Sequence, residues 1–123
     1  VSSISLYAED RPEGAADLIN VNGDPAAGDL AAALQAGRLV FLTDVDGVRD
    51  AAGQPLRRLS EREAEELVAS GVIAGGMIPK ISACLKALSA GATARIIDGK
   101  QPHALLRELE EGSGGTTIYK EQR

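Results

Sequence analysis

The chain of 123 residues is poor in cysteine, in aromatic residues and in basic charge. Cys84 is the single cysteine, which excludes an intrachain disulfide and a cysteine zinc site and makes a reducing cytoplasm the expected compartment. Only Tyr7, Phe41 and Tyr119 are aromatic, so a mainly aliphatic core is predicted. The net charge of −5 argues against sequence-independent binding of nucleic acid, because such binding needs clustered lysines and arginines.

Long apolar runs are lacking as well. None approaches the roughly 20 residues of a membrane-spanning helix, so we expect no membrane partner. The length fits one domain with one core. Because the sequence begins with Val1 and not with methionine, we expect it to be part of a longer protein.

Helix signals recur along the chain. Asp24 followed by Pro25 predicts an N-cap and a first helical residue, Ser60 with Glu63 forms a capping box, and Pro79 predicts a further helix start. Glycines at positions 37, 71 and 91 end the first three predicted helices. The predicted helices cover residues 25–36, 61–70, 79–90 and 102–111.

Short apolar segments between these helices predict strands at residues 1–8, 18–21, 39–43, 94–98 and 116–120, and residues 50–59 predict a surface turn or small hairpin. The nearly all-apolar segment 39–43 is typical of a strand that is covered on both faces. We therefore predict an α/β fold with a mainly parallel sheet covered by helices on both faces. Ligands bind at the carboxyl ends of such strands, which indicates the loops at residues 20–24, 44–48, 72–80 and 98–99.

The motif TDVDGV at residues 43–48 places two acids at the end of a strand. Haloacid-dehalogenase-type phosphatases have a similar motif, in which Asp44 would be the nucleophile and Asp46 its helper. That chemistry also needs a lysine and a later pair of acids for magnesium, because a carboxylate cannot approach a phosphate dianion without cations. Lys80 could be the lysine, but no acid pair follows a later strand. Arg49 occupies the turn position of an EF-hand loop, which excludes that calcium site.

The motif GGMIPK at residues 75–80 combines two glycines with a lysine near a helix start. Gly75 and Gly76 allow the backbone to approach an anion, and Lys80 adds a positive charge beside unpaired helix amides. A phosphate cradle and a flexible loop with a solvated lysine are about equally supported by this motif alone.

The motif NVNGDP at residues 20–25 places Asn20 and Asn22 on one side of an extended segment, next to Asp24. Capping alone would explain Asp24, but it does not explain the two asparagines. No Walker A pattern occurs, which excludes an ordinary P-loop kinase. His103 has no nucleophile or carboxylate that the sequence can place beside it, so we expect a helix-end residue.

Taken in order, the segments NVNGDPAAGDLAAAL, LVFLTDVDGV, GVIAGGMIPKISACLKAL and IIDGKQPHALLREL resemble the carboxyl-terminal half of the amino-acid kinase family, and within it the acetylglutamate kinases. The resemblance covers about residues 18–118. It implies the nucleotide-binding half of a carbamate-kinase-like fold. It also implies ATP-dependent phosphorylation of the side-chain carboxylate of N-acetyl-L-glutamate, a step of arginine biosynthesis.

The resemblance also implies roles for individual residues. Asn20 and Asn22 would bind the amino-acid substrate, and Asp24 would organise the catalytic lysines. Lys80 would bind the transferring phosphoryl group and stabilise the charge that develops toward ADP. ATP would carry Mg²⁺ on its phosphates, so no protein metal site is expected. The implied nucleotide-binding residues are Asp44, Val45, Asp46, Gly47, Val48, Arg49, Val72, Ile73, Ala74, Gly76 and Met77.

The sequence departs from the family pattern at several places. It has NGD where many relatives have NAD, which resembles the kinases of lysine biosynthesis that act on carrier-protein-linked aminoadipate. The tail EEGSGGTTI resembles part of the arginine feedback site but lacks its phenylalanine and is one residue shorter. The family's first catalytic lysine, glycine-rich loop and substrate arginine do not occur before Asn20.

We therefore expect residues 1–123 to be the ATP-binding portion of a larger, homo-oligomeric kinase and to be inactive alone. Two other classes stay open, a phosphatase of the DxDG type and a noncatalytic nucleotide-binding domain.

Overall fold

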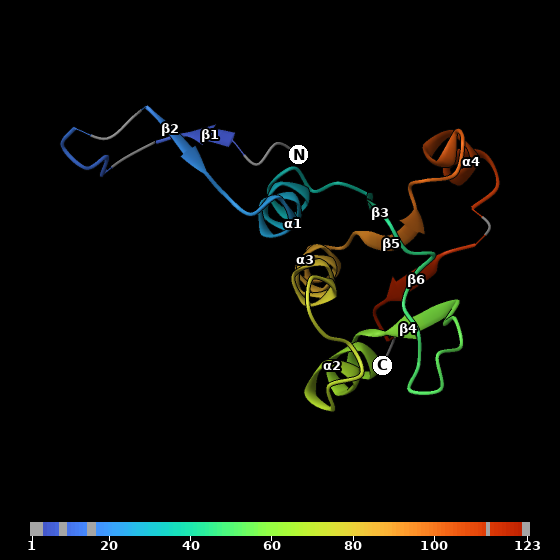
Figure 1. Ribbon diagram of the computed structural model, residues 1–123. Helices are drawn as coiled ribbons and strands as arrows, with labels where there is room; N and C mark the ends of the chain where they lie inside the picture. Colours follow the sequence, from blue (N-terminus) through green and yellow to red (C-terminus); the bar gives the residue numbers. More distant parts are fainter. Residues whose placement is uncertain (1–3, 8–9, 15–16, 113, 122–123) are drawn as a thin grey trace.

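A four-stranded sheet lies at the centre of the computed structural model, which describes residues 4–7, 10–14, 17–112 and 114–121 (Figure 1). The strand order is β3 (Arg38–Thr43), β5 (Thr93–Asp98), β6 (Thr116–Tyr119) and β4 (Arg58–Ser60). β3 pairs with β5 and β4 pairs with β6 in parallel, whereas β5 and β6 are antiparallel. The prediction of a mainly parallel sheet with helices on both faces is confirmed.

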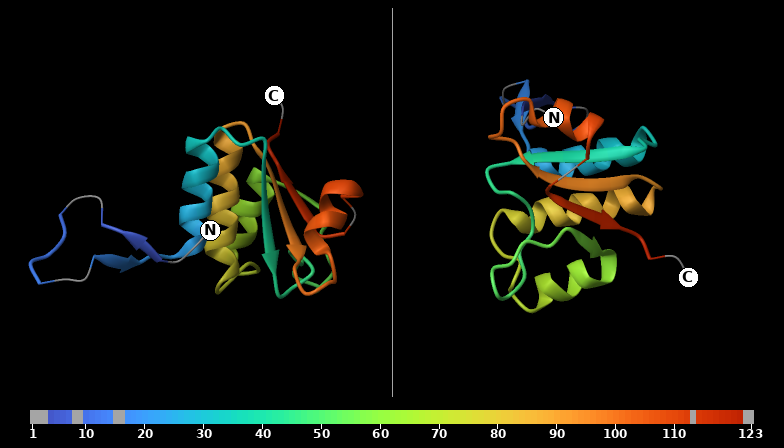
Figure 2. Two further views of the ribbon diagram at one scale, coloured as in Figure 1. Left: turned by 90° about the horizontal axis from the view of Figure 1, so that it is seen from above. Right: turned by 90° about the vertical axis from the view of Figure 1, so that its right-hand side faces the viewer.

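Helices cover the two faces of the sheet unequally (Figure 2). α1 (Gly23–Ala33), α2 (Glu61–Ala69) and α3 (Met77–Ser89) lie on one face, and the short α4 (Ala104–Glu110) lies on the other. Within the described ranges, the helices are too short or too polar to cross a lipid bilayer.

The main core lies between α3 and the middle of the sheet. Its buried members are aliphatic apart from Phe41 and Cys84, which confirms the predicted composition of the core. The buried side chains of α3 recur every three to four residues. This spacing places them on the helix face toward β5 and β6. The core contains Ile81, Cys84 and Leu88 from α3, Ile96 from β5 and Ile118 from β6.

Several predicted helix ends are confirmed. The Ser60 hydroxyl accepts from the Glu63 backbone N–H at 3.2 Å, and the Glu63 carboxylate accepts from the Ser60 N–H at 2.8 Å, so the capping box is complete. Gly71 and Gly91 follow α2 and α3 with φ angles of 81° and 92°, which favour glycine. His103 lies at the N-terminal end of α4, as expected for a helix-end residue.

Three predicted helix starts were wrong. α4, predicted from residue 102, begins at Ala104. Asn22, and not Asp24, is the N-cap of α1, and its side chain accepts from the Asp24 N–H at 3.0 Å. Asparagine and aspartate cap equally well, so local sequence could not decide between them. α3 begins at Met77, two residues before Pro79, because proline is tolerated throughout the first turn, where amides have no partner within the helix. The stop of α1 also differs, since Gln35 and not Gly37 has the positive φ of 51°.

The structure differs from the predicted strands in two ways: the first strand is shorter, and one further strand was not predicted. Of residues 4–7, the described part of the first predicted strand, β1 (Ile4–Leu6) is extended and pairs with β2 (Leu18–Asn20) in a hairpin that projects away from the rest of the molecule (Figure 1). Residues 1–3 and 8 of that prediction lie outside the described residues. The predicted turn at 50–59 is closed by a bridge between Arg49, which precedes it, and Pro55, and its last two residues begin the unpredicted strand β4.

The helices and strands are oriented so that the ends at which ligands could bind lie together. α1 and α3 run side by side in the same direction, and β3 and β5 return in the opposite direction (Figure 2). The N-termini of the two helices therefore lie at the same edge as the carboxyl ends of the two strands. This is the edge at which α/β folds bind ligands.

Candidate functional site

Asp24 and Lys80 meet at this edge although 56 residues separate them. Asp24 lies in the first turn of α1, and Lys80 is the fourth residue of α3. The Lys80 ammonium donates to Oδ2 of Asp24 at 3.0 Å, and the two side chains are 24% and 23% exposed. A charge pair that is partly shielded from water, yet still reachable, is suited to act on a bound ligand.

The cap of α1 makes this pairing possible. Because Asn22 satisfies the Asp24 N–H, the Asp24 carboxylate is not needed as a cap and can face α3. The capping interpretation of this motif was thus correct in kind but belongs to Asn22. Asn22 and Asn20 are both exposed, and Asn20 ends β2 at the base of the projecting hairpin.

The N-terminus of α3 is open to a ligand. Gly76 is its N-cap and makes no side-chain capping bond, and the first turn contains no acidic residue. A Cβ atom added to Gly75 or Gly76 would meet no heavy atom within 4 Å. The positive end of the helix dipole therefore faces open space beside Lys80, which favours an anion. In this first turn the Ile78 N–H already donates to the Gly75 carbonyl at 3.2 Å, and Pro79 has no N–H.

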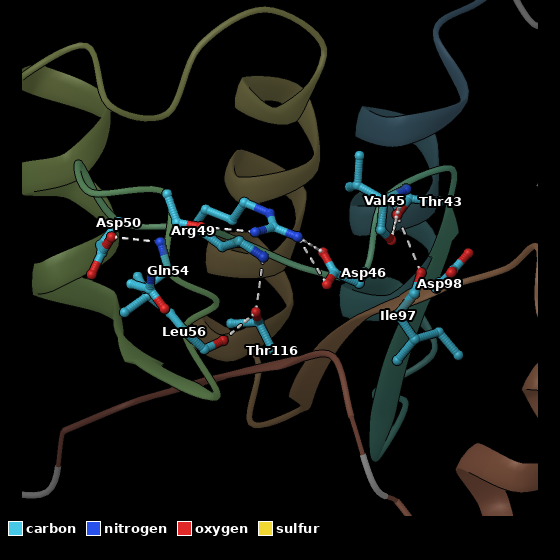
Figure 3. A network of polar contacts seen from close by, with 12 residues as sticks. Thr43, Val45, Asp46, Arg49, Asp50, Gln54, Leu56, Ile97, Asp98 and Thr116 are labelled. Carbon is cyan, nitrogen blue, oxygen red and sulfur yellow. Dashed lines mark hydrogen bonds and ion pairs between the residues drawn. The ribbon is translucent and has the colours of Figure 1, made fainter.

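The loop after β3 is held in shape by side chains at both of its ends (Figure 3). The Thr43 hydroxyl donates to the Val45 carbonyl at 2.8 Å, and it also accepts from the Val45 N–H at 3.2 Å. Arg49 donates to both carboxylate oxygens of Asp46 at 3.0 Å. Asp44 is exposed at the tip of the strand.

Thr116, which no sequence motif singled out, anchors the other end of this loop (Figure 3). Its hydroxyl accepts from the Val48 N–H at 2.9 Å and donates to the Leu56 carbonyl at 2.5 Å. A Cβ atom on Gly47, where φ is 141°, would lie 2.6 Å from the same hydroxyl oxygen. The loop therefore packs directly on β6. These contacts join residues 60 and 68 positions apart, which no local pattern reveals.

The predicted nucleotide-binding residues differ in what they can offer. Val48 and Ile73 are each 3% exposed and belong to the core, so only their backbones could contact a ligand. Gly47 is buried, whereas Val72 and Met77 are half-buried. Exposed positions at the same edge are Asp44, Val45, Asp46, Arg49, Ala74 and Gly76.

A cavity of about 410 Å³ lies next to this edge, between α4 and the carboxyl end of β5. Its lining excludes Asp24 and Lys80, and its charged members are Asp46, Asp98, Arg107, Glu108 and Glu111. A backbone hydrogen bond from Lys100, followed by one from the Gln101 side chain, holds the pKa of Asp98 below its ordinary value. Asp46 and Glu108 are paired with Arg49 and Arg95, so the lining carries both signs of charge and is separate from the Asp24–Lys80 pair.

Among the residues that the structure describes, no group of three or more histidine, cysteine, aspartate and glutamate side chains is placed to hold a metal ion. Asp24 and Asp46 are already paired with Lys80 and Arg49.

Comparisons with known proteins agree with this architecture. A sequence model of the amino acid kinase family matches residues 4–98. An acetylglutamate kinase from Dehalococcoides mccartyi is 57% identical over 118 residues, which is 96% of this chain and 43% of that protein. One from Cereibacter sphaeroides is 51% identical over 105 residues, covering 85% of this chain and 36% of that protein. The chain thus spans less than half the length of these relatives.

Solved structures also superpose on most of this chain. N-acetylglutamate synthase from Neisseria gonorrhoeae, in complex with coenzyme A and L-arginine, superposes with a TM-score of 0.75 at 34% identity, over 85% of this chain and 24% of that one. Carbamate kinase from Giardia lamblia, bound to AMP-PNP, superposes with a TM-score of 0.69 at 25% identity, over 90% of this chain and 36% of that one.

Proposed function

The chain belongs to the amino acid kinase family, and from this premise we propose that it forms the nucleotide-binding part of an enzyme that uses ATP to phosphorylate the side-chain carboxylate of N-acetyl-L-glutamate. The reaction would be a step of arginine biosynthesis. The single unpaired cysteine suits a cytoplasmic enzyme. The observation that carries the proposal is the pairing of Asp24 with Lys80 beside the open N-terminus of α3.

Lys80 and α3 have the properties that phosphoryl transfer requires. In this reaction the protein mainly positions the reactants and neutralises charge, because the substrate carboxylate is itself the nucleophile. Lys80 would bind the transferring phosphoryl group, and the glycine backbone at the positive end of α3 would lie close to neighbouring phosphate oxygens. Asp24 would hold the Lys80 ammonium in place through the 3.0 Å hydrogen bond.

The loop after β3 would form the rim of the nucleotide site. Its backbone is fixed by Thr43 at one end and by Thr116 at the other, so a ligand would meet a preformed surface. Because Asp46 pairs with Arg49, Asp44 is the acid of the TDVDGV motif that makes no ion pair within the described residues.

The residues fit magnesium that arrives with the nucleotide. Mg²⁺ keeps several waters and binds substrate phosphates more readily than a dedicated protein cage, and the described residues contain no such cage. When bound, the ion would neutralise phosphate charge. Lys80 would supply the positive charge that the protein itself contributes.

Replacing Lys80 tests the proposal in the protein that contains this chain. Lys80→Ala removes a charge aimed at the transition state, and we expect a loss of about 3 kcal/mol of transition-state stabilisation, or roughly a hundredfold in kcat. A coupled ADP-release assay and a hydroxamate assay for the acyl phosphate measure the loss. Lys86→Ala is the matched control, because Lys86 lies in the same helix and pairs with Asp29 on the surface. A near-normal rate for Lys80→Ala would refute the assignment.

The same assays separate the other candidates. A phosphatase would depend on Asp44, so Asp44→Asn would abolish phosphate release. Gly23, the first residue of α1, is the feature that favours a carrier-linked aminoadipate acceptor. Comparing free N-acetyl-L-glutamate with a carrier-linked acceptor distinguishes the two kinases.

A further inference from the structure

α1 and α3 pack closely against each other at Gly28. A Cβ atom on Gly28 would lie 2.8 Å from Cα of Ala83, 2.9 Å from its Cβ and 2.9 Å from its carbonyl oxygen. Two of these three atoms belong to the backbone, so no side-chain rotation could make room. An added methyl group must therefore push the two helices apart.

The backbone of Gly28 does not itself demand glycine. Gly28 lies inside α1, and it is not among the glycines with positive φ. Glycine in a helix interior is unfavourable relative to alanine, so its presence here needs a reason from packing. The close contact with Ala83 is that reason.

This contact lies one helical turn from the Asp24–Lys80 pair. Gly28 follows Asp24 by four residues, and Ala83 follows Lys80 by three, so each contact residue shares a helix face with one member of the pair. The spacing of the two helices at Gly28 and the 3.0 Å hydrogen bond are thus properties of one interface. The Asp29–Lys86 pair farther along is exposed and does not fix this spacing.

We propose that Gly28 is a positioning residue, which sets the distance between α1 and α3 and thereby holds Asp24 against Lys80. The inference rests on the proposed function of that pair. An added methyl group would lengthen the separation of the carboxylate and the ammonium, and Lys80 would lose the contact that orients it toward the phosphoryl group. A misplacement of about 1 Å can lower a rate by about a hundredfold.

The test uses Gly28→Ala in the protein that contains this chain. We expect kcat to fall at least tenfold, while the KM for ATP changes less than threefold. Gly37→Ala is the matched control, because a Cβ atom there would meet nothing within 4 Å, and it should leave kcat unchanged. Ala83→Ser enlarges the same contact from α3 and should also lower kcat.

A double-mutant cycle with Asp24→Asn separates positioning from a general effect on the fold. If Gly28→Ala has already separated the pair, adding Asp24→Asn should change kcat less than threefold further. A purely structural role would leave the effect of Asp24→Asn undiminished, and that additivity would overturn the proposal. A crystal structure of Gly28→Ala that retains the Lys80–Asp24 hydrogen bond, or a failure of both helix variants to fold, would overturn it too.

These outcomes differ from failure of the proposed function. If Lys80→Ala keeps the normal rate, the assignment of Lys80 is wrong. If Lys80→Ala is inactive while Gly28→Ala behaves like Gly37→Ala, only the role of Gly28 is wrong.

Discussion

The role that each acidic residue of the candidate site can have depends on the basic side chain with which it pairs. Asp24 lies in the first turn of α1 and Asp46 in the loop after β3, and each accepts from a basic side chain at 3.0 Å. Asp46 pairs with Arg49 three residues away, and both side chains are about half exposed, so this pair shapes a loop. Asp24 pairs with Lys80 of another helix in a partly buried position. This pair can therefore fix the position of α1 relative to α3.

The buried thiol of Cys84 leads to a prediction about how stability depends on pH. Burial raises the pKa of its thiol to about 12, and the nearby negative charge of Asp24 adds to the shift. The ordinary pKa in the unfolded chain is about 9.0. The folded state therefore binds the proton more tightly, so this contribution to stability is complete below pH 9 and is lost as pH rises toward 12.

We expect the free energy of unfolding to fall by about 1.4 kcal/mol at pH 10 through this group alone. Urea unfolding at pH 7.5, 9 and 10 measures the fall. Cys84→Ala removes the ionisable thiol, so its stability should decline less between pH 9 and pH 10 than that of the unmodified chain. Parallel curves for the two proteins would contradict the predicted shift.

At the scale of elements, α4 is attached to the sheet through one buried ion pair. Arg95 of β5 donates to both carboxylate oxygens of Glu108 at 2.6 and 2.9 Å, and the two side chains are 11% and 3% exposed. The same guanidinium donates to Thr117 and to the carbonyls of Gly112 and Gly114. It therefore joins α4, the glycine-rich turn and β6.

Glu108→Ala should destabilise the chain by about 3–5 kcal/mol, because it leaves the largely buried Arg95 without its counter-charge. Hydrogen exchange should show the amides of residues 104–110 losing protection first, and urea unfolding gives the total. Glu66→Ala is the control, because its pair with Arg62 is exposed and should contribute less than about 1 kcal/mol. Equal effects of the two substitutions would contradict a clamping role for Arg95.

The elements also show how far local sequence reaches. Capping signals and apolar periodicity predicted the four helices and most strands, because those signals act within one or two turns. The three-residue strand β4 was missed, since its pairing with β6 depends on residues 59 positions away. The choice between Asn22 and Asp24 as cap depended on Lys80, and the role of Thr116 depended on Val48 and Leu56. These are contacts between distant segments, which local patterns do not encode.

At the scale of the whole molecule, the candidate site occupies only one edge of the fold. The carboxyl ends of β3 and β5 and the N-termini of α1 and α3 meet there, while Asn20 lies on a hairpin that projects from the rest (Figure 2). Within the described residues, β3 pairs only with β5, and Leu42 on this strand is 47% exposed. The phosphate side of the proposed site is thus more fully built than the side for the amino acid.

This asymmetry predicts that the chain of 123 residues binds ATP but does not turn it over with N-acetyl-L-glutamate. Binding to the folded state at ten times the dissociation constant should add about 1.4 kcal/mol of stability and raise the melting temperature by about 5 °C. Adenosine, which lacks phosphates, should give a smaller rise, and Lys80→Ala should reduce the rise with ATP. If ATP gives no rise, the nucleotide assignment is wrong. If the chain alone releases ADP in response to N-acetyl-L-glutamate, the amino-acid side must be complete within these residues, and Asn20 and Asn22 become the first side chains to replace.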